Sequence, residues 1–157
     1  MPREIERKYL VDDRSVLRGL AGVVFRQGYI LIQDGIVVRV RTEGTRAVIT
    51  LKGKSQGIAR SEYEYEIPFA DAEEMLAELC IRPHIEKTRY TTTWGAKLWE
   101  IDVFGGENSG LVLAEIELES EEEEFEVPPW VGVEVSDDLR YYTANLVHHP
   151  YARWEDI

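Results

Sequence analysis

The stretch PREIERKYLV, residues 2–11, combines a strand-like alternation with several charged side chains. At the two-residue period of a β-strand, Glu4, Glu6 and Lys8 share one face, and the opposite face mixes apolar and basic side chains. Neither face is plainly apolar or plainly solvated. The charged face is therefore either the wet side of a half-buried sheet or the lining of a site.

Strand-like runs dominate the rest of the chain. Each run alternates or is rich in β-branched residues, and Gly, Asp-Gly or Glu-Gly-Thr punctuation separates several of them. The sequence predicts strands at 3–11, 23–33, 36–44, 46–53, 60–69, 85–94, 96–104 and 111–120. Turn signals at QDGIV, at RTEGTRA and at Gly95 predict that most neighbouring strands are antiparallel.

Helical signals are few and lie at 12–20, 71–80 and 136–149. In the last of these segments Ser136 is the expected N-cap, with Asp137 and Asp138 in the first turn. The sequence thus predicts a β-rich α+β fold. The chain length and the lack of a dividing linker predict one domain over residues 1–157.

The charged residues of the later strands also fall on one face. Arg39 and Arg41 share a face, as do Lys87 and Arg89, and so do Glu115 and Glu117, while the opposite faces are largely apolar. Alternation alone favours an open sheet with a solvated charged side, because antiparallel sheets commonly face water. The alternative is a closed barrel of eight strands with its charged side inward.

The composition limits the partners that we expect. The formal net charge is -12, from 30 acidic and 18 basic residues, which argues against binding of nucleic acid or of an anionic membrane. A polyanion would have to meet a local basic cluster or a bound cation. The single cysteine, Cys80, and the absence of a signal-like or membrane-spanning apolar run predict a cytoplasmic protein.

Nine blocks in order, from EIERKYLV through VVRVR, ITLKG, RSEYEYEI, IEKTRY and LAEIELES to LRYYTANL, resemble the CYTH superfamily, the triphosphate tunnel metalloenzymes. The resemblance covers essentially the whole chain. It implies an eight-stranded antiparallel closed barrel, a triphosphate tunnel with a polar, charged interior and a few covering helices. The chain is most similar to the short bacterial inorganic triphosphatases, which act on tripolyphosphate with Mg²⁺ or Mn²⁺. Two departures are FRQGYI, where that branch has LRQGYL, and YTANL after LRY.

The resemblance also implies roles for individual residues. The expected metal ligands are Glu4, Glu6, Glu115 and Glu117. The expected substrate-binding residues are Lys8, Arg39, Arg41, Lys52, Lys87, Arg89 and Arg140. Catalytic roles are expected for Lys8, Lys87, Glu62 and Glu64, and Glu100 and Asp102 are expected mainly to pair with neighbouring arginines. Taken singly, each of the basic residues favours a surface charge, whereas their alternating positions together favour the site.

The expected reaction is hydrolysis of inorganic tripolyphosphate or of another triphosphate. Adenylate cyclase and nucleoside or thiamine triphosphatase are alternatives within the same superfamily, because one tunnel can hold any triphosphate tail. A non-catalytic polyphosphate-binding module is an alternative from another class. The sequence does not indicate an oligomeric state.

Overall fold

A computed structural model of the protein describes residues 2–156. The strands are β1 (Arg3–Val11), β2 (Val23–Gln33), β3 (Ile36–Glu43), β4 (Arg46–Lys52), β5 (Ala59–Glu66), β6 (Ile81–Trp94), β7 (Lys97–Phe104), β8 (Val112–Glu117) and β9 (Val131–Glu134). The helices are α1 (Phe69–Glu78) and α2 (Thr143–His148), and short 3-10 helices span Arg14–Leu17, Gly106–Asn108, Leu139–Tyr141 and Tyr151–Asp156.

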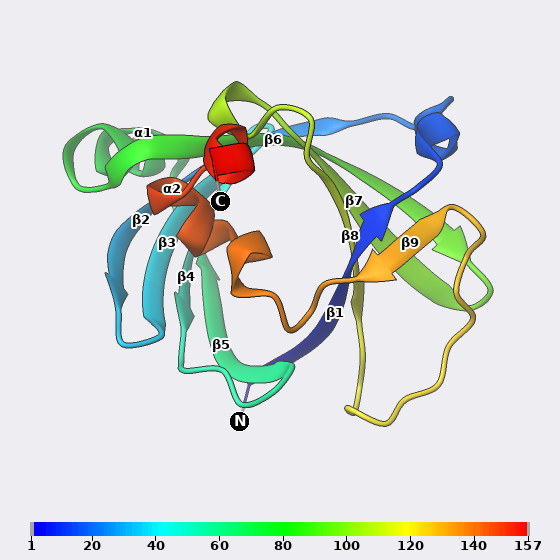
Figure 1. The fold of residues 1–157 in the computed structure, drawn as a ribbon. Helices are drawn as coiled ribbons and strands as arrows, with labels where there is room; N and C mark the ends of the chain where they lie inside the picture. Colours follow the sequence, from blue (N-terminus) through cyan, green and yellow to red (C-terminus); the bar gives the residue numbers. More distant parts are fainter. Residues whose placement is uncertain (1, 157) are drawn as a thin grey trace.

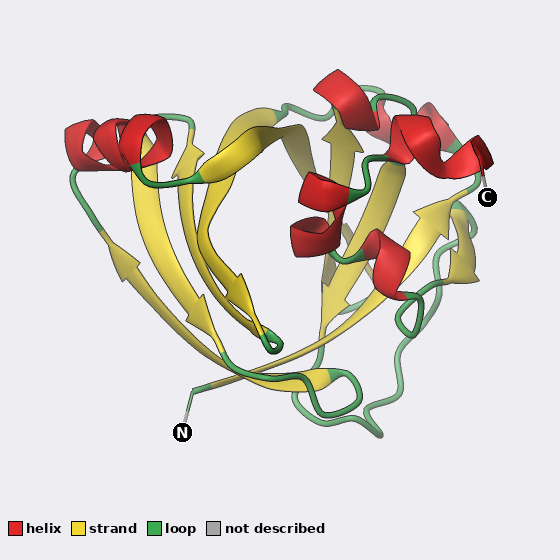
Figure 2. Cartoon of the chain, turned by 60° about the vertical axis from the view of Figure 1, so that its left-hand side comes forward, coloured by secondary structure: helices red, strands yellow, loops and turns green. Residues whose placement is uncertain are grey.

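The sheet closes on itself (Figures 1 and 2). Its strand order is β5-β4-β3-β2-β6-β7-β8-β1-β9, all pairings are antiparallel, and an additional pairing joins β5 to β1. That pairing turns the first eight strands into a closed barrel, as the resemblance implied. The seam is short, because Arg3, Glu4 and Ile5 of β1 alone pair with Ser61, Arg60 and Ala59 of β5.

The ninth strand corrects the sequence prediction. The sequence predicts no strand between residues 120 and 136, but Val131–Glu134 pairs with β1 around Tyr9 and Val11. This pairing occupies the part of the β1 edge that β5 does not reach. β9 has only four residues, too few for alternation to mark it as a strand.

Two predicted helices are also shorter than expected. Of the segment 12–20, only Arg14–Leu17 is helical, as one 3-10 turn capped by Asp13. The segment 136–149 is broken at Tyr142, whose extended backbone (φ -70°, ψ 127°) separates the turn Leu139–Tyr141 from α2. Ser136 is not the N-cap: its hydroxyl accepts from the backbone N–H of Lys8 at 2.9 Å, and Asp138 caps the turn instead.

Strand ends differ by a few residues for identifiable reasons. β5 stops at Glu66, because Pro68 has no N–H for a sheet and is compatible with the start of α1 at Phe69. β6 begins at Ile81 rather than at residue 85. The turns at Asp34-Gly35 and at Gly95 have positive φ, as hairpin turns require.

Three hydrophobic clusters hold this barrel. One covers the outer face of β1, β7 and β8 and centres on Trp99, which is fully buried against Tyr9 and Trp130. A second lies between α1 and the outer face of β2, β3 and β4. The third fills one end of the interior, where Leu146 and Val147 of α2 pack against residues such as Ile85 and Leu113.

The contact between α1 and β2 is close. A Cβ atom added at Gly28 would lie 2.7 Å from the Cβ of Cys80, so β2 has room there only for glycine. Among the described residues, no helix has the length and apolar character needed to cross a bilayer. The prediction of one domain over residues 1–157 stays a prediction.

The packing of α1 gives the first testable prediction. Leu76 is 1% exposed in the cluster with Val40 and Ala47, so Leu76→Ala should lower the free energy of unfolding by about 2–5 kcal/mol. Leu79, at the end of the same helix, is 57% exposed. Leu79→Ala should therefore change that free energy by less than about 1 kcal/mol. Urea unfolding of both variants measures the difference, and equal losses would contradict the packing described for α1.

Candidate active site

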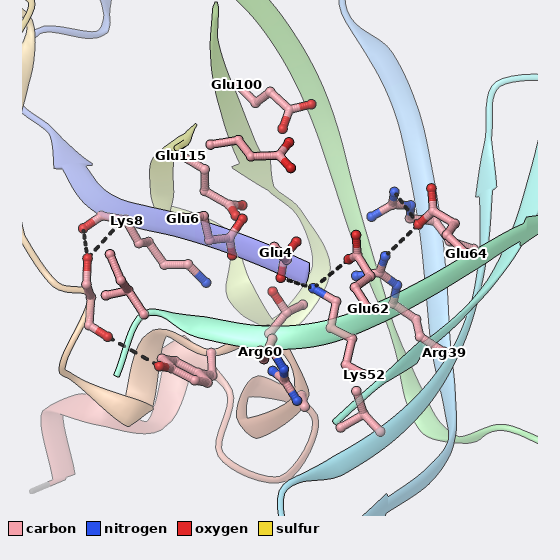
Figure 3. Close-up of a pocket in the computed structure, with 18 of the residues that line it drawn as sticks. Glu4, Glu6, Lys8, Arg39, Lys52, Arg60, Glu62, Glu64, Glu100 and Glu115 are labelled. Atoms are coloured by element: carbon pink, nitrogen blue, oxygen red, sulfur yellow. Dashed lines mark hydrogen bonds and ion pairs between the residues drawn. The ribbon is translucent and has the colours of Figure 1, made fainter. Parts of the chain in front are cut away.

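The interior of the barrel contains a cavity of about 250 Å³ (Figure 3). Side chains from all eight barrel strands, β1 to β8, line it, because the inward-facing residues of each strand alternate with those of the outer clusters. Among the described residues, seven basic side chains line it: Lys8, Arg39, Arg41, Lys52, Arg60, Lys87 and Arg89. Seven acidic side chains also line it: Glu4, Glu6, Glu62, Glu64, Glu100, Glu115 and Glu117.

On the β6–β7 side, a buried carboxylate ties two cations together. Asp102, 1% exposed, accepts from Lys87 Nζ at 2.7 Å and from Arg89 Nε and Nη2 at 2.7 and 2.9 Å. Burial alone would raise the pKa of Asp102, but Lys87 and Arg89 hold that pKa below its ordinary value. Burial lowers the pKa of Lys87 to about 8 against the attraction of Asp102. The role expected for Asp102, pairing with its basic neighbours, agrees with this geometry.

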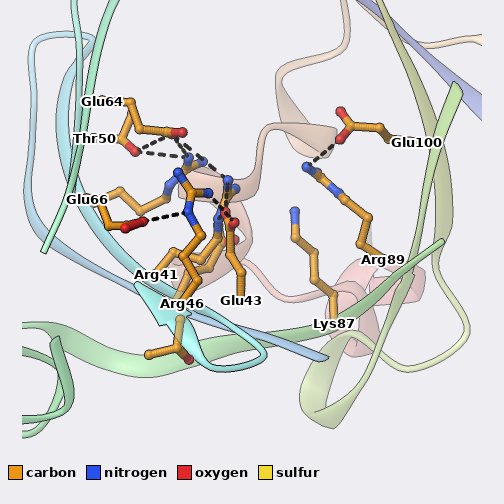
Figure 4. A network of polar contacts seen from close by, with 12 residues as sticks. Arg41, Glu43, Arg46, Thr50, Glu64, Glu66, Lys87, Arg89 and Glu100 are labelled. Carbon is orange, nitrogen blue, oxygen red and sulfur yellow. Dashed lines mark hydrogen bonds and ion pairs between the residues drawn. The ribbon is translucent and has the colours of Figure 1, made fainter. Parts of the chain in front are cut away.

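On the β3–β4–β5 side, two arginines are held by hydroxyl and carboxylate groups (Figure 4). Arg39 Nη2 donates to Thr50 Oγ1 at 3.3 Å, and that hydroxyl donates to Glu64 Oε2 at 2.8 Å. Arg41 Nε donates to Glu43 Oε2 at 2.8 Å. Nε of Arg39 is buried without a partner among the described residues, so this guanidinium has donor capacity left for a ligand.

The third part of the lining is acidic and lies around β1 (Figure 3). Lys52 Nζ lies 2.9 Å from Glu4 Oε1 and 3.4 Å from Glu62 Oε2. Although burial and Arg39 oppose its charge, the surrounding glutamates raise the pKa of Lys52. The ammonium of Lys52 therefore links the carboxylates of β1 and β5 across the seam.

Glu6 is in the opposite situation. It has no ion pair among the described residues, and burial together with Glu115 and Glu4 raises the pKa of Glu6 well above its ordinary value. β1 and β8 bring these groups together, because Glu6 lies opposite Glu117 and Lys8 lies opposite Glu115 in the antiparallel register. The pKa of Glu115 lies well below its ordinary value. Burial opposes the charged form of this carboxylate, but Lys8, a hydrogen bond with Glu6, and Arg89 favour it.

This donor set fits a hard divalent cation. Carboxylate oxygens are the ligands that Mg²⁺ and Mn²⁺ prefer, and a cation near Glu6 would favour the charged form of a buried carboxylate that has no ion pair among the described residues. Within residues 2–156, no three acidic, histidine or cysteine side chains already converge as a metal-binding group. Glu4 instead faces Lys52, so ion binding requires that carboxylate to exchange its partner.

The C-terminal segment also reaches this cavity, but through residues other than Arg140, which the sequence analysis expected there. Tyr142, Thr143 and Ala144 line it beside Ser136. Lys8 Nζ donates to the backbone carbonyl of Tyr141 at 3.2 Å and lies 5.4 Å from the centroid of the Tyr142 ring. None of these positions carries a charge pattern that sequence analysis could have used. Glu43 was also missed, although it shares the face of Arg39 and Arg41.

Arg140 does not lie in the cavity. Its guanidinium pairs with Asp138 at 2.7 Å and stacks 4.9 Å from the centroid of Trp154, and its side chain is 46% exposed. The break at Tyr142 explains the difference, because Arg140 belongs to the separate turn before α2. The other expected site residues, on β1, β3, β4, β5, β6 and β8, all contribute to the lining.

Comparison with known proteins assigns the family. Residues 2–151 match the model of the CYTH domain. An inorganic triphosphatase of Acetivibrio thermocellus is 46% identical over 156 residues, 99% of this chain and 100% of the relative, and one of Nitrosomonas europaea is 42% identical over 142 residues, 88% of this chain and 92% of the relative. A crystal structure of an inorganic triphosphatase superposes with a TM-score of 0.65 at 39% identity and covers 91% of this chain and 96% of that one. The chain therefore belongs to the CYTH domain family.

Proposed function

We propose that this protein is a metal-dependent inorganic triphosphatase that hydrolyses tripolyphosphate inside the barrel. The observation that carries the proposal is the cavity inside the barrel, with seven basic and seven acidic side chains among the described residues. Because these charges balance in number, a triphosphate that enters alone would leave an excess of negative charge. Divalent cations that enter with the triphosphate offset most of that excess. The names of the two relatives from Acetivibrio and Nitrosomonas support the same substrate.

The basic residues would bind the phosphoryl groups. Arginine forks and lysine ammonium groups form charge-assisted hydrogen bonds with phosphate oxygens, and those bonds strengthen where water is excluded. The proposed set is Lys8, Arg39, Arg41, Lys52, Lys87 and Arg89. Arg140 is not part of it, because it lies outside the cavity.

Glu4, Glu6, Glu115 and Glu117 would hold the divalent ion, and Mg²⁺ and Mn²⁺ both fit their oxygen donors. When bound, such an ion supplies charge neutralisation at the phosphate oxygens and makes a coordinated water more acidic. Lys8 and Lys87 would stabilise the negative charge on the departing phosphate. Glu62 and Glu64 would orient the attacking water through their carboxylates. Glu62 suits a proton-accepting role, since burial and Glu4 raise its pKa.

Several finer expectations stay predictions. The choice between Mg²⁺ and Mn²⁺, the cytoplasmic location, and the expected lack of nucleic-acid and membrane partners rest on the sequence alone. The alternatives of adenylate cyclase and of nucleoside or thiamine triphosphatase become outcomes of the substrate test below, as does binding without turnover.

The substrate test compares tripolyphosphate, ATP and thiamine triphosphate, each with Mg²⁺ and with Mn²⁺. We expect tripolyphosphate to give pyrophosphate and phosphate at a kcat/KM at least about tenfold above that for ATP, because most of the side chains that line the cavity are charged and suit phosphate groups better than an apolar base. Phosphate release and chromatography of the nucleotides measure the products. Cyclic AMP as the main product would overturn the proposal, and so would metal-dependent binding without any hydrolysis.

The metal assignment predicts the effect of Glu115→Gln. The amide cannot supply the charge of a metal ligand, so activity should fall at least about 100-fold and the metal titration should shift to higher concentration. The metal-free protein should also become less stable at neutral pH, because the variant loses the charged Glu115 carboxylate that compensates Lys8 and Arg89. Glu119→Gln, on the exposed continuation of the same segment, is the matched control and should change neither property. An unchanged metal titration in Glu115→Gln would contradict the assignment.

Lys87 predicts a pH dependence. Its pKa is lowered to about 8, so the ammonium is charged below that pH and becomes neutral above it. In Mg²⁺, kcat/KM for tripolyphosphate should therefore fall as the pH rises through about 8, because a phosphate contact loses its charge. Lys87→Met should have a low rate without this transition. Lys52→Met should also be slow but should keep it, since the pKa of Lys52 is raised. If the transition disappears in Lys52→Met but persists in Lys87→Met, its assignment to Lys87 is wrong.

A further inference from the structure

Phe25 is an aromatic residue on the charged side of the barrel wall. It lies on β2, where it pairs with Glu43 of β3 and with Lys87 of β6. The side chain is 6% exposed, yet Phe25 belongs to none of the three hydrophobic clusters formed by the described residues. Burial in an apolar core therefore does not account for this ring.

The neighbours of the ring are cations. The Cζ atoms of Arg41 and of Arg89 each lie 4.8 Å from the centroid of Phe25, and Lys87 Nζ lies 5.9 Å from it. Arg41 comes from β3 and the other two from β6, which are the strands on either side of β2. These three cations line the cavity, whereas Phe25 is not among its lining residues. The ring thus packs against the basic groups that line the cavity without lining the cavity itself.

An aromatic ring suits this position for a physical reason. The negative face of the ring attracts a guanidinium or ammonium group, most strongly where water is excluded. Unlike a carboxylate, the ring leaves the N–H donors of the cation free for other partners. Arg41 needs such a partner, since burial and the nearby Arg39 and Arg89 lower its pKa. Glu43 takes only the Nε and Nη2 groups of Arg41, which leaves donor capacity toward the cavity.

We propose that Phe25 is a positioning residue, whose ring fixes the orientation of Arg41 and Arg89 toward each other so that both guanidinium groups face the triphosphate together. Phe25 does not touch the substrate and acts through the arginines. This inference rests on the proposed function, because it assigns the two arginines to the binding of a phosphoryl group.

The test grades the electrostatics of the ring without changing its packing. Mono-, di- and trifluorophenylalanine at position 25 progressively weaken the negative face at nearly constant size. We expect KM for tripolyphosphate to rise with each fluorine, to about tenfold in the trifluoro variant, while kcat and the melting temperature change little. Phe25→Leu should show the full rise in KM. The matched control is the same series at Phe125, which packs against Trp99 at 6.0 Å outside the barrel and should give no trend.

A second readout separates this inference from the proposed function. NMR of the arginine side chains reports whether the signals of Arg41 and Arg89 carry a ring-current shift that disappears in Phe25→Leu. If the unmodified protein neither binds nor hydrolyses tripolyphosphate, the proposed function fails, and the NMR still decides whether the ring holds the arginines. If that protein is active but KM is flat across the fluorinated series at position 25, the positioning role of Phe25 is wrong. Absence of the ring-current shift overturns it as well.

Discussion

The ion pairs of Asp102 with Lys87 and Arg89 are the interaction on which the interior of the barrel depends. A single carboxylate, 1% exposed, holds two cations of β6 from its place on β7. Removal of one partner from such a group leaves an uncompensated buried charge, which is far more costly than a missing apolar contact. Closure of a barrel with its charged side inward is possible because the inward cations meet carboxylates, a hydroxyl, aromatic faces or, for Arg60, backbone carbonyls.

A charged interior moves the stabilising apolar contacts elsewhere. Buried ion pairs contribute little net stability, since the loss of hydration offsets their attraction. The outer faces of the strands are therefore covered: α1 packs over Val40 and Ala47, and the segment with Phe125 and Trp130 packs over Trp99. At one end α2 fills the interior with Leu146 and Val147. The cavity occupies the part of the barrel that these clusters leave open.

Much of the wall could be predicted from the sequence, because alternation assigns side chains to faces. Arg39, Arg41, Glu115 and Glu117 share the faces that alternation predicted, and the eight longer strands are all present. Closure could not be read from alternation, because it depends on a seam of three residue pairs between β1 and β5, and the family resemblance supplied it. The sequence prediction for the segment 136–149 failed for a similar reason. The turn at Asp138 and the break at Tyr142, which direct Arg140 away from the cavity and Tyr142 into it, are set by tertiary contacts such as that of Lys8 with Tyr141.

The position of β1 has a consequence for synthesis of the protein on the ribosome. β1 leaves the ribosome before the strands with which it pairs, since one of its edges pairs with β8 and the other with β5 and β9. Until residues 112–134 emerge, its long edge has no partner, and the growing chain holds an open sheet rather than a barrel. Unpaired edges of this kind invite association between chains, and pairings distant in sequence form slowly. Charged side chains on an edge strand oppose such association, and Glu4, Glu6 and Lys8 place three of them on β1.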